Sequence, residues 1–178
     1  MKKHKEFVIP FSGLKQGRHE FNFEIDNTFF ESFEYDEFNN AAINLAVVLN
    51  RSSTMLALEI NATGTVNVYC DVTNEPYDQP VEADLELLVK FGDEFNDDND
   101  EILIIPHGDF EVDISQYVYE MIVLAVPLKK MHPGIEDGTL KSAALEKLEK
   151  LHPKEVKENK NKETDPRWDS LKKLLTDK

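Results

Sequence analysis

Apolar and polar side chains alternate with a period of two residues along much of the first two thirds of the chain. The clearest runs cover residues 21–25, 43–49, 56–70, 81–91 and 102–105. This period places the apolar side chains on one face of a strand and the polar ones on the other. Runs of this length are typical of half-buried strands in an antiparallel sheet.

Helix signals stand between these runs. Residues 28–31 have the spacing of a capping box that begins with Thr28, and residues 113–116 have a looser version of it. Behind the second box, apolar residues recur at helical spacing up to Pro127, which ends the helix. We expect the last turn of this helix to be buried on most sides. The chain is therefore predicted to be α+β, with an antiparallel sheet, open or curled into a partial barrel, and a few packed helices.

The last quarter of the chain is organised differently. Apolar spacing predicts a short amphipathic helix over 140–151, and residues 154–163 have the composition of a mobile charged linker. Asp165 as N-cap and Pro166 at the first position predict a final helix with Trp168 on its apolar face. The predicted divisions are an acidic α+β core (1–133), a short helix and linker (134–164) and a C-terminal helix (165–178).

Acidic residues outnumber basic ones. The chain has 35 Asp and Glu against 20 Lys and Arg, a formal net charge of −15. The excess peaks over residues 78–120, where 14 acidic side chains accompany the single lysine Lys90. Such a surface repels phosphates, so we expect no binding of bare nucleic acid by the core. The charge favours a basic protein as partner; the alternative is a solvated surface that only keeps the chain soluble.

Two groups of carboxylates in this stretch form the candidate partner-binding face. Glu82, Asp84 and Glu86 alternate with apolar residues, so they should project from one face of a strand as a row. A loop after that strand is expected to extend the row at its end. The acidic residues of this loop are Asp93, Glu94, Asp97, Asp98, Asp100 and Glu101. The loop lacks the glycine and the final glutamate of an EF-hand, which disfavours calcium.

The sequence contains no motif of a known catalytic or cofactor site. It has no glycine-rich phosphate loop and no nucleophile elbow, and its five histidines stand far apart. His107 and Asp109 leave a spatial His–carboxylate pair open as a route to an enzyme. Cys70 is expected to be a small core residue, because the neighbouring Asp71 disfavours a thiolate. One cysteine and scattered histidines supply no zinc site, so we expect no metal and no cofactor.

The sequence shows neither a signal peptide nor a membrane helix. Its longest apolar run covers residues 121–126, whereas a membrane helix needs about 20 residues. The single cysteine excludes an internal disulfide and suits a reducing compartment. We therefore expect a cytoplasmic protein with no membrane partner.

Three motifs, in order, resemble the YceD family of bacterial and chloroplast proteins. A strand ends at Cys70, and a helix carries Glu120 and an apolar run that ends at Pro127, with His132 soon after. The chain then closes on Asp165, Pro166, Arg167 and Trp168, followed by a Leu-x-x-Leu-Leu helix. The resemblance implies a non-enzymatic ribosome-biogenesis factor that supports accumulation of large-subunit (23S) ribosomal RNA, with no catalytic residues to carry over.

The resemblance also bears on partners and metals. In this family the gene commonly lies beside that of a small, basic large-subunit ribosomal protein. Many members have Cys-x-x-Cys at the strand end and a further cysteine cluster that resembles a zinc site. Here Thr73 stands at the second position, and residues 129–164 contain no cysteine.

The charge and the resemblance together favour a basic large-subunit ribosomal protein, or a pre-ribosomal particle, bound by the acidic face. Three alternatives remain open at this point. The chain could be an interaction module unrelated to ribosomes, or a small enzyme with an unlocated His–carboxylate site. It could also contact RNA directly through residues 141–173, which belong to the only part of the chain that is not net acidic.

Overall fold

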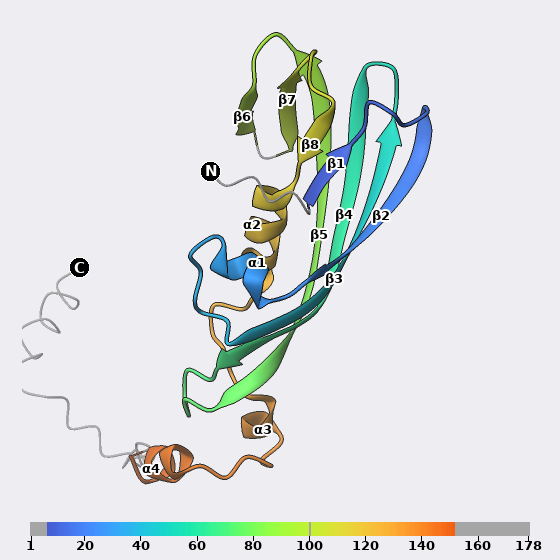
Figure 1. The fold of residues 1–178 in the computed structure, drawn as a ribbon. Coiled ribbons are helices and arrows are strands. Elements are labelled where there is room, and N and C mark those ends of the chain that lie inside the picture. Colours follow the sequence, from blue (N-terminus) through green and yellow to red (C-terminus); the bar gives the residue numbers. More distant parts are fainter. Residues whose placement is uncertain (1–6, 100, 152–178) are drawn as a thin grey trace, which may run out of the picture. The chain divides into compact units, whose positions relative to one another are not determined.

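The structure is a computed structural model that describes residues 7–99 and 101–151 (Figure 1). The chain divides after Ser142 into two compact units. The elements, in chain order, are β1 (Val8–Pro10), β2 (Gly17–Ile25), α1 (Asn27–Glu31), β3 (Asn40–Arg51), β4 (Met55–Tyr69), β5 (Pro76–Gly92), β6 (Asn96–Asn99), β7 (Ile102–Pro106), β8 (Glu111–Asp113), α2 (Ser115–Ala125), α3 (Pro133–Glu136) and α4 (Ala143–Leu151).

A six-stranded sheet with the order β2-β3-β4-β5-β7-β6 forms the centre of the first unit, and β1 and β8 pair separately. Neighbouring strands are antiparallel except β5 and β7, which are parallel. The two edge strands, β2 and β6, do not pair with each other, so the sheet is open rather than a barrel. The predicted α+β fold is confirmed.

Alternate apolar side chains of β3, β4 and β5 form the core on one face of this sheet, which we call the inner face. Val47, Ile60 and Leu87 are all fully buried there. The helices α1 and α2 lie on the same side of the sheet (Figure 1). The opposite face, the outer face, carries the polar residues of the same alternation, so the sequence pattern separates a packed face from a solvated one.

The segment after β5 differs from the expected loop. Residues Asn96–Asn99 form β6 at the edge of the sheet, and β7 lies between β5 and β6. Leu103 and Ile105 of β7 are buried, whereas every residue of β6 is exposed. The apolar strand β7 therefore lies between two other strands, and the polar strand β6 forms the edge of the sheet, where charged side chains are tolerated.

The N-terminus of α1 also differs from the prediction. Its N-cap is Asp26, not Thr28. One Asp26 carboxylate oxygen accepts hydrogen bonds from the Thr28 hydroxyl at 2.5 Å and from the Thr28 backbone N–H at 2.9 Å. These two bonds lower the pKa of Asp26. The carboxylate takes the cap because it is the stronger acceptor, and the Thr28 hydroxyl becomes a donor to it.

Helix α2 ends before Pro127 as predicted, and Val118 and Ile122 are fully buried. Its last turn is buried on most sides, as expected: Ile122 is fully buried, Val123 and Ala125 pack partly buried against the core, and Leu124 is 82% exposed. The helix packs against β5, and Leu124 lines an open groove beside that strand. Apolar side chains thus remain open to solvent beside β5.

The amphipathic helix predicted over 140–151 is present as α4, in the second unit. The linker predicted over 154–163 and the final helix with Asp165, Pro166, Arg167 and Trp168 lie outside the described residues. In the part of the chain that the structure describes, no helix combines the length and apolar character needed to cross a membrane.

Replacement of Gly64 by alanine should destabilise the sheet. A Cβ at this position in β4 would overlap the backbone of β3, at Ala42 and at the Cα of Ile43. The backbone of a paired strand cannot rotate away from the new methyl group as a flexible side chain can. We therefore expect the free energy of unfolding to fall by about 1–3 kcal/mol. Gly108→Ala is the matched control, since a Cβ there meets nothing within 4 Å. Equal urea midpoints for the two variants would contradict the packing described.

Candidate functional site

The predicted acidic row lies on the outer face of β5. Glu82, Asp84 and Glu86 are exposed, while the inner face of the strand carries the flanking Val81 and Leu87, both buried, and the partly buried Ala83 and Leu85. The register with β4 is continuous from Pro76 to Lys90, so the three carboxylates leave the same face without interruption by a bulge.

The neighbouring strand adds to this charge. Glu59 of β4 is exposed and stands directly opposite Glu86, whereas Asn61 stands opposite Asp84. Like charges directly opposite on paired strands destabilise a sheet. Within the described residues, neither Glu59 nor the row of β5 makes an ion pair with a lysine or arginine. Glu59 and the three carboxylates of the row therefore have no ion-pair partner among the described residues.

The centre of the outer face is neutral and shallow. A depression of about 360 Å³ extends across β2, β3 and β4. Its floor includes the small side chains of Asn44, Ala46, Asn61 and Thr63, and Glu24 lies at its β2 side. The outer face therefore combines a flat polar centre with carboxylates on both sides, a form that suits a basic surface more than a small molecule.

The segment after β5 folds back beside the acidic row instead of extending it. Asp97 lines a groove together with Asp84, and Glu101 lines a second, smaller cavity with Asp84 and Glu86. Three more members of the predicted loop, Asp93, Glu94 and Asp98, are exposed. Asp100 lies outside the described residues. Asp97 of β6 and Glu101, which directly precedes β7, thus lie beside the row.

The turn between β4 and β5 begins at Cys70, a family-motif residue. The Cys70 carbonyl accepts from the Asn74 backbone N–H at 2.8 Å, and the Cys70 N–H donates to the Glu75 carbonyl at 2.9 Å. Asn74 has a positive φ of 58°, which asparagine tolerates better than most residues. The turn is closed by these backbone bonds, and the Thr73 hydroxyl accepts from the Glu75 N–H.

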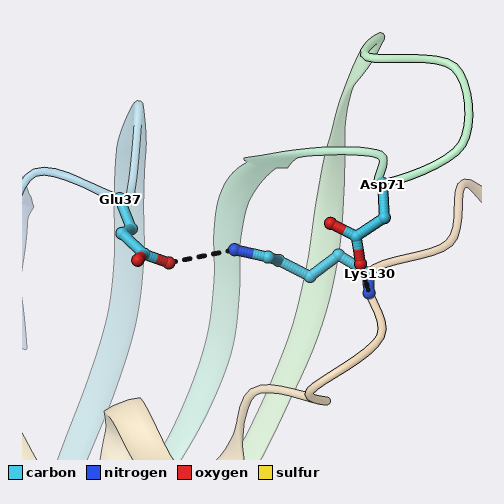
Figure 2. A network of polar contacts seen from close by, with 3 residues as sticks. All are labelled: Glu37, Asp71 and Lys130. Carbon is cyan, nitrogen blue, oxygen red and sulfur yellow. Dashed lines mark hydrogen bonds and ion pairs between the residues drawn. The ribbon is translucent and has the colours of Figure 1, made fainter.

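Asp71 joins this turn to the segment after α2. Its carboxylate accepts from the Lys130 backbone N–H at 2.7 Å, and its own N–H donates to the Lys130 carbonyl at 2.8 Å. Figure 2 shows the Lys130 side chain extending from there to Glu37, with an Nζ–Oε2 distance of 3.0 Å. Three segments distant in the sequence are therefore tied together by one lysine.

His132 and Cys70 complete this junction. The Cys70 sulfur accepts from the His132 backbone N–H at 3.3 Å, and His132 Nδ1 accepts from the Gly134 N–H at 2.9 Å, which caps α3. Burial raises the pKa of the Cys70 thiol, but hydrogen bonds from Thr73 and from His132 outweigh it, so the net pKa is lowered. Cys70 is only 2% exposed, as expected of a core cysteine.

The structure does not support the His–carboxylate pair. His107 is exposed, and its ring stacks on Phe91 with the centroids 6.3 Å apart. The Asp109 backbone N–H donates to the Pro106 carbonyl in a turn. In residues 7–99 and 101–151, no three His, Cys, Asp or Glu side chains gather in a group that could hold a metal ion.

The remaining family-motif residues of the first unit lie on and after α2. Glu120 is exposed, accepts from the Gln116 side chain at 2.5 Å and lines the groove that Asp84 and Asp97 share. Pro127 follows the end of the helix. Sequence reasoning missed Lys130 and Glu37, because 59 and 93 residues separate them from their respective partners.

The chain matches one family model, described as large ribosomal RNA subunit accumulation protein YceD, over residues 58–175. The match covers more than half of the chain. The chain belongs to the YceD family. Its matched part begins within β4 and therefore includes the acidic row of β5, the turn at Cys70 and helix α2. Comparison with curated proteins and with solved structures gave no match.

Removal of the Asp71 carboxylate should loosen the segment after α2. Asp71→Ala deletes a hydrogen bond from a charged acceptor to the Lys130 backbone, so we expect the free energy of unfolding to fall by about 1–2 kcal/mol. Glu37→Ala removes only the exposed end of the ion pair and should cost less than about 1 kcal/mol. Chemical denaturation measures both. If the two variants lost the same free energy of unfolding, the Asp71–Lys130 backbone bond would contribute no more than the exposed ion pair, which would contradict this account of the junction.

Proposed function

We propose that this chain is a non-enzymatic ribosome-biogenesis factor that supports accumulation of large-subunit ribosomal RNA by binding a basic large-subunit ribosomal protein. Membership of the YceD family supports the link to ribosomal RNA. The observation that carries the proposed partner is the set of carboxylates on β4 and β5, which is exposed and lacks counter-charges from the described part of the chain.

The charge explains why the partner is a protein. Free ribosomal proteins are basic and bind RNA through phosphate contacts. A folded acidic surface attracts such a protein at long range. Once bound, it pairs with the lysine and arginine side chains that would otherwise bind the wrong RNA. The same surface repels RNA phosphates. Support for ribosomal RNA would then come through delivery or protection of the ribosomal protein, in the cytoplasm where ribosomes are assembled.

Charge reversal of the row should slow the encounter with this partner. In the variant Glu82→Lys, Asp84→Lys and Glu86→Lys, we expect the association rate with a purified basic large-subunit protein to fall by about tenfold or more at low salt. The urea midpoint should not fall, because all three side chains are exposed and a lysine opposite Glu59 replaces a like-charged pair. Stopped-flow mixing at several salt concentrations measures the rate and its salt dependence.

The matched control reverses three exposed carboxylates near α1, Glu31, Glu34 and Asp36, and so has the same net charge. Its association rate should stay within about threefold of the unmodified chain, since α1 lies on the inner-face side of the sheet and the row lies on the outer face (Figure 1). An equal effect of the two triple variants would mean that only net charge matters, and that the row is not the binding face.

Bare ribosomal RNA should bind negligibly to the full chain at physiological salt. The reason is the repulsion between phosphates and the acidic surface of the first unit. Electrophoretic mobility of protein-free large-subunit RNA, with and without the chain, measures this. Tight binding at that salt would favour direct contact with RNA and would remove the need for a protein partner.

A further inference from the structure

One edge of β5 is unpaired over half its length. β4 pairs with β5 from Pro76 to Lys90, but on the other side β7 pairs only with residues 88–92. Among the described residues, no strand continues the line of β7 along Val81–Leu87. An exposed edge of this length is a template for an added strand, and proteins commonly block such edges.

The backbone groups of the acidic row face this free edge. Leu88 donates its backbone N–H to the Glu101 carbonyl at 2.8 Å, on the β7 side of the strand. Because N–H groups alternate between the two edges of a strand, those of Glu82, Asp84 and Glu86 point to the same side. Pro80 fits this alternation, since its nitrogen carries no hydrogen and faces the free edge rather than β4.

Two cavities follow the free edge. The larger, about 630 Å³, lies between β5, β6 and α2, and its apolar lining includes Leu85, Met121 and the 82% exposed Leu124. The smaller, about 250 Å³, is lined by Leu85, Leu88 and Glu101 at the point where β7 begins. A strand added in the line of β7 would therefore find apolar contacts on its helix side.

All the side chains that line these two cavities and are charged at neutral pH are acidic. They are Asp84, Glu86, Asp97, Glu101 and Glu120. A segment placed there needs apolar side chains towards Leu124 and cations towards the carboxylates. An extended strand supplies both when basic and apolar residues alternate along it, because its side chains point to opposite faces.

We propose that the free edge of β5 binds its partner by β-strand addition, and that the added strand is an extended segment of a basic protein in which Lys or Arg alternates with apolar residues. This inference deepens the proposed function, because it names the place and the form of the contact. Backbone hydrogen bonds to β5 supply affinity, and the groove beside α2 together with the carboxylates supplies selectivity.

The same charges argue against a second copy of this chain as the occupant. Two β5 edges paired with each other would bring the carboxylates of Glu82, Asp84 and Glu86 on one copy against the same residues on the other. Like charges across paired strands are unfavourable. The acidic edge thus blocks self-association and still admits a basic strand.

Hydrogen exchange of individual backbone amides tests the proposal with a nine-residue peptide of alternating lysine and valine as the probe. In the free full chain, the amides of Glu82, Asp84 and Glu86 should exchange fast, and saturating peptide should slow them by at least about tenfold. The amides of Ala83 and Leu85 face β4 and should change little. Slow exchange at the row without peptide, or no added protection with it, would overturn the proposal.

Backbone methylation of the peptide separates strand addition from simple charge attraction. Two peptides of equal charge, N-methylated on the lysines or on the valines, block opposite edges of the strand. One of them should bind as the unmodified peptide does, and the other should bind at least about tenfold more weakly. Equal binding of all three peptides would show that no backbone pairing occurs.

Two exposed leucines provide matched variants of the protein. Leu124→Asp replaces an apolar side chain of the groove with a charged one and should weaken peptide binding by about tenfold or more, since the added strand would lose an apolar contact there. Folding should be little affected, because Leu124 is 82% exposed. Leu128→Asp is the control, because Leu128 is fully exposed and does not line the groove. Equal affinities of the two variants would contradict a strand beside α2.

The outcomes distinguish this inference from the proposed function. If a large-subunit protein binds with the predicted salt dependence but gives no protection of the edge amides, the acidic face acts through side chains alone. If the lysine–valine peptide protects the edge but no large-subunit protein binds, the strand site stands and the ribosomal partner is wrong.

Discussion

The whole structure depends on the burial of alternate apolar side chains along β3, β4 and β5. Val47, Ile60 and Leu87 lie fully buried on one face of the sheet, and α1, α2 and the β1–β8 pair pack over that face. Because the side-chain period of a strand is two, the same burial obliges every second residue to face away from the core. The outer face is therefore determined by the core, and its residues are free to serve another purpose.

That freedom explains how the chain can carry so many carboxylates in one strand. Glu82, Asp84 and Glu86 face away from the core, and Glu59 stands opposite Glu86 with no ion-pair partner in the described residues. Such a face costs stability through repulsion, and a basic partner relieves it. The unpaired edge of β5 belongs to the same residues, so charge and backbone recognition coincide at one place.

The sequence predicted the strands and α2 well because their signals are local. The alternation around Glu82 places that side chain outside, and Pro127 ends α2, with no knowledge of distant contacts. β7 lies between β5 and β6 because its apolar side chains are buried there in the assembled sheet. This burial depends on contacts between strands, and no local sequence pattern contains that information. The contact of Lys130 with Asp71 spans 59 residues and was missed for the same reason. The N-cap at Asp26 could have been predicted from the sequence, since aspartate is among the residues most favoured at this position.

The most direct test is the ratio of large- to small-subunit ribosomal RNA in cells of the native host that lack this chain. The account predicts that the unmodified chain restores the ratio, and that the variant with reversed Glu31, Glu34 and Asp36 does so too. The variant with lysine at positions 82, 84 and 86 should fail to restore it at equal protein level. Full restoration by that variant would contradict the claim that the acidic face of β5 performs the function.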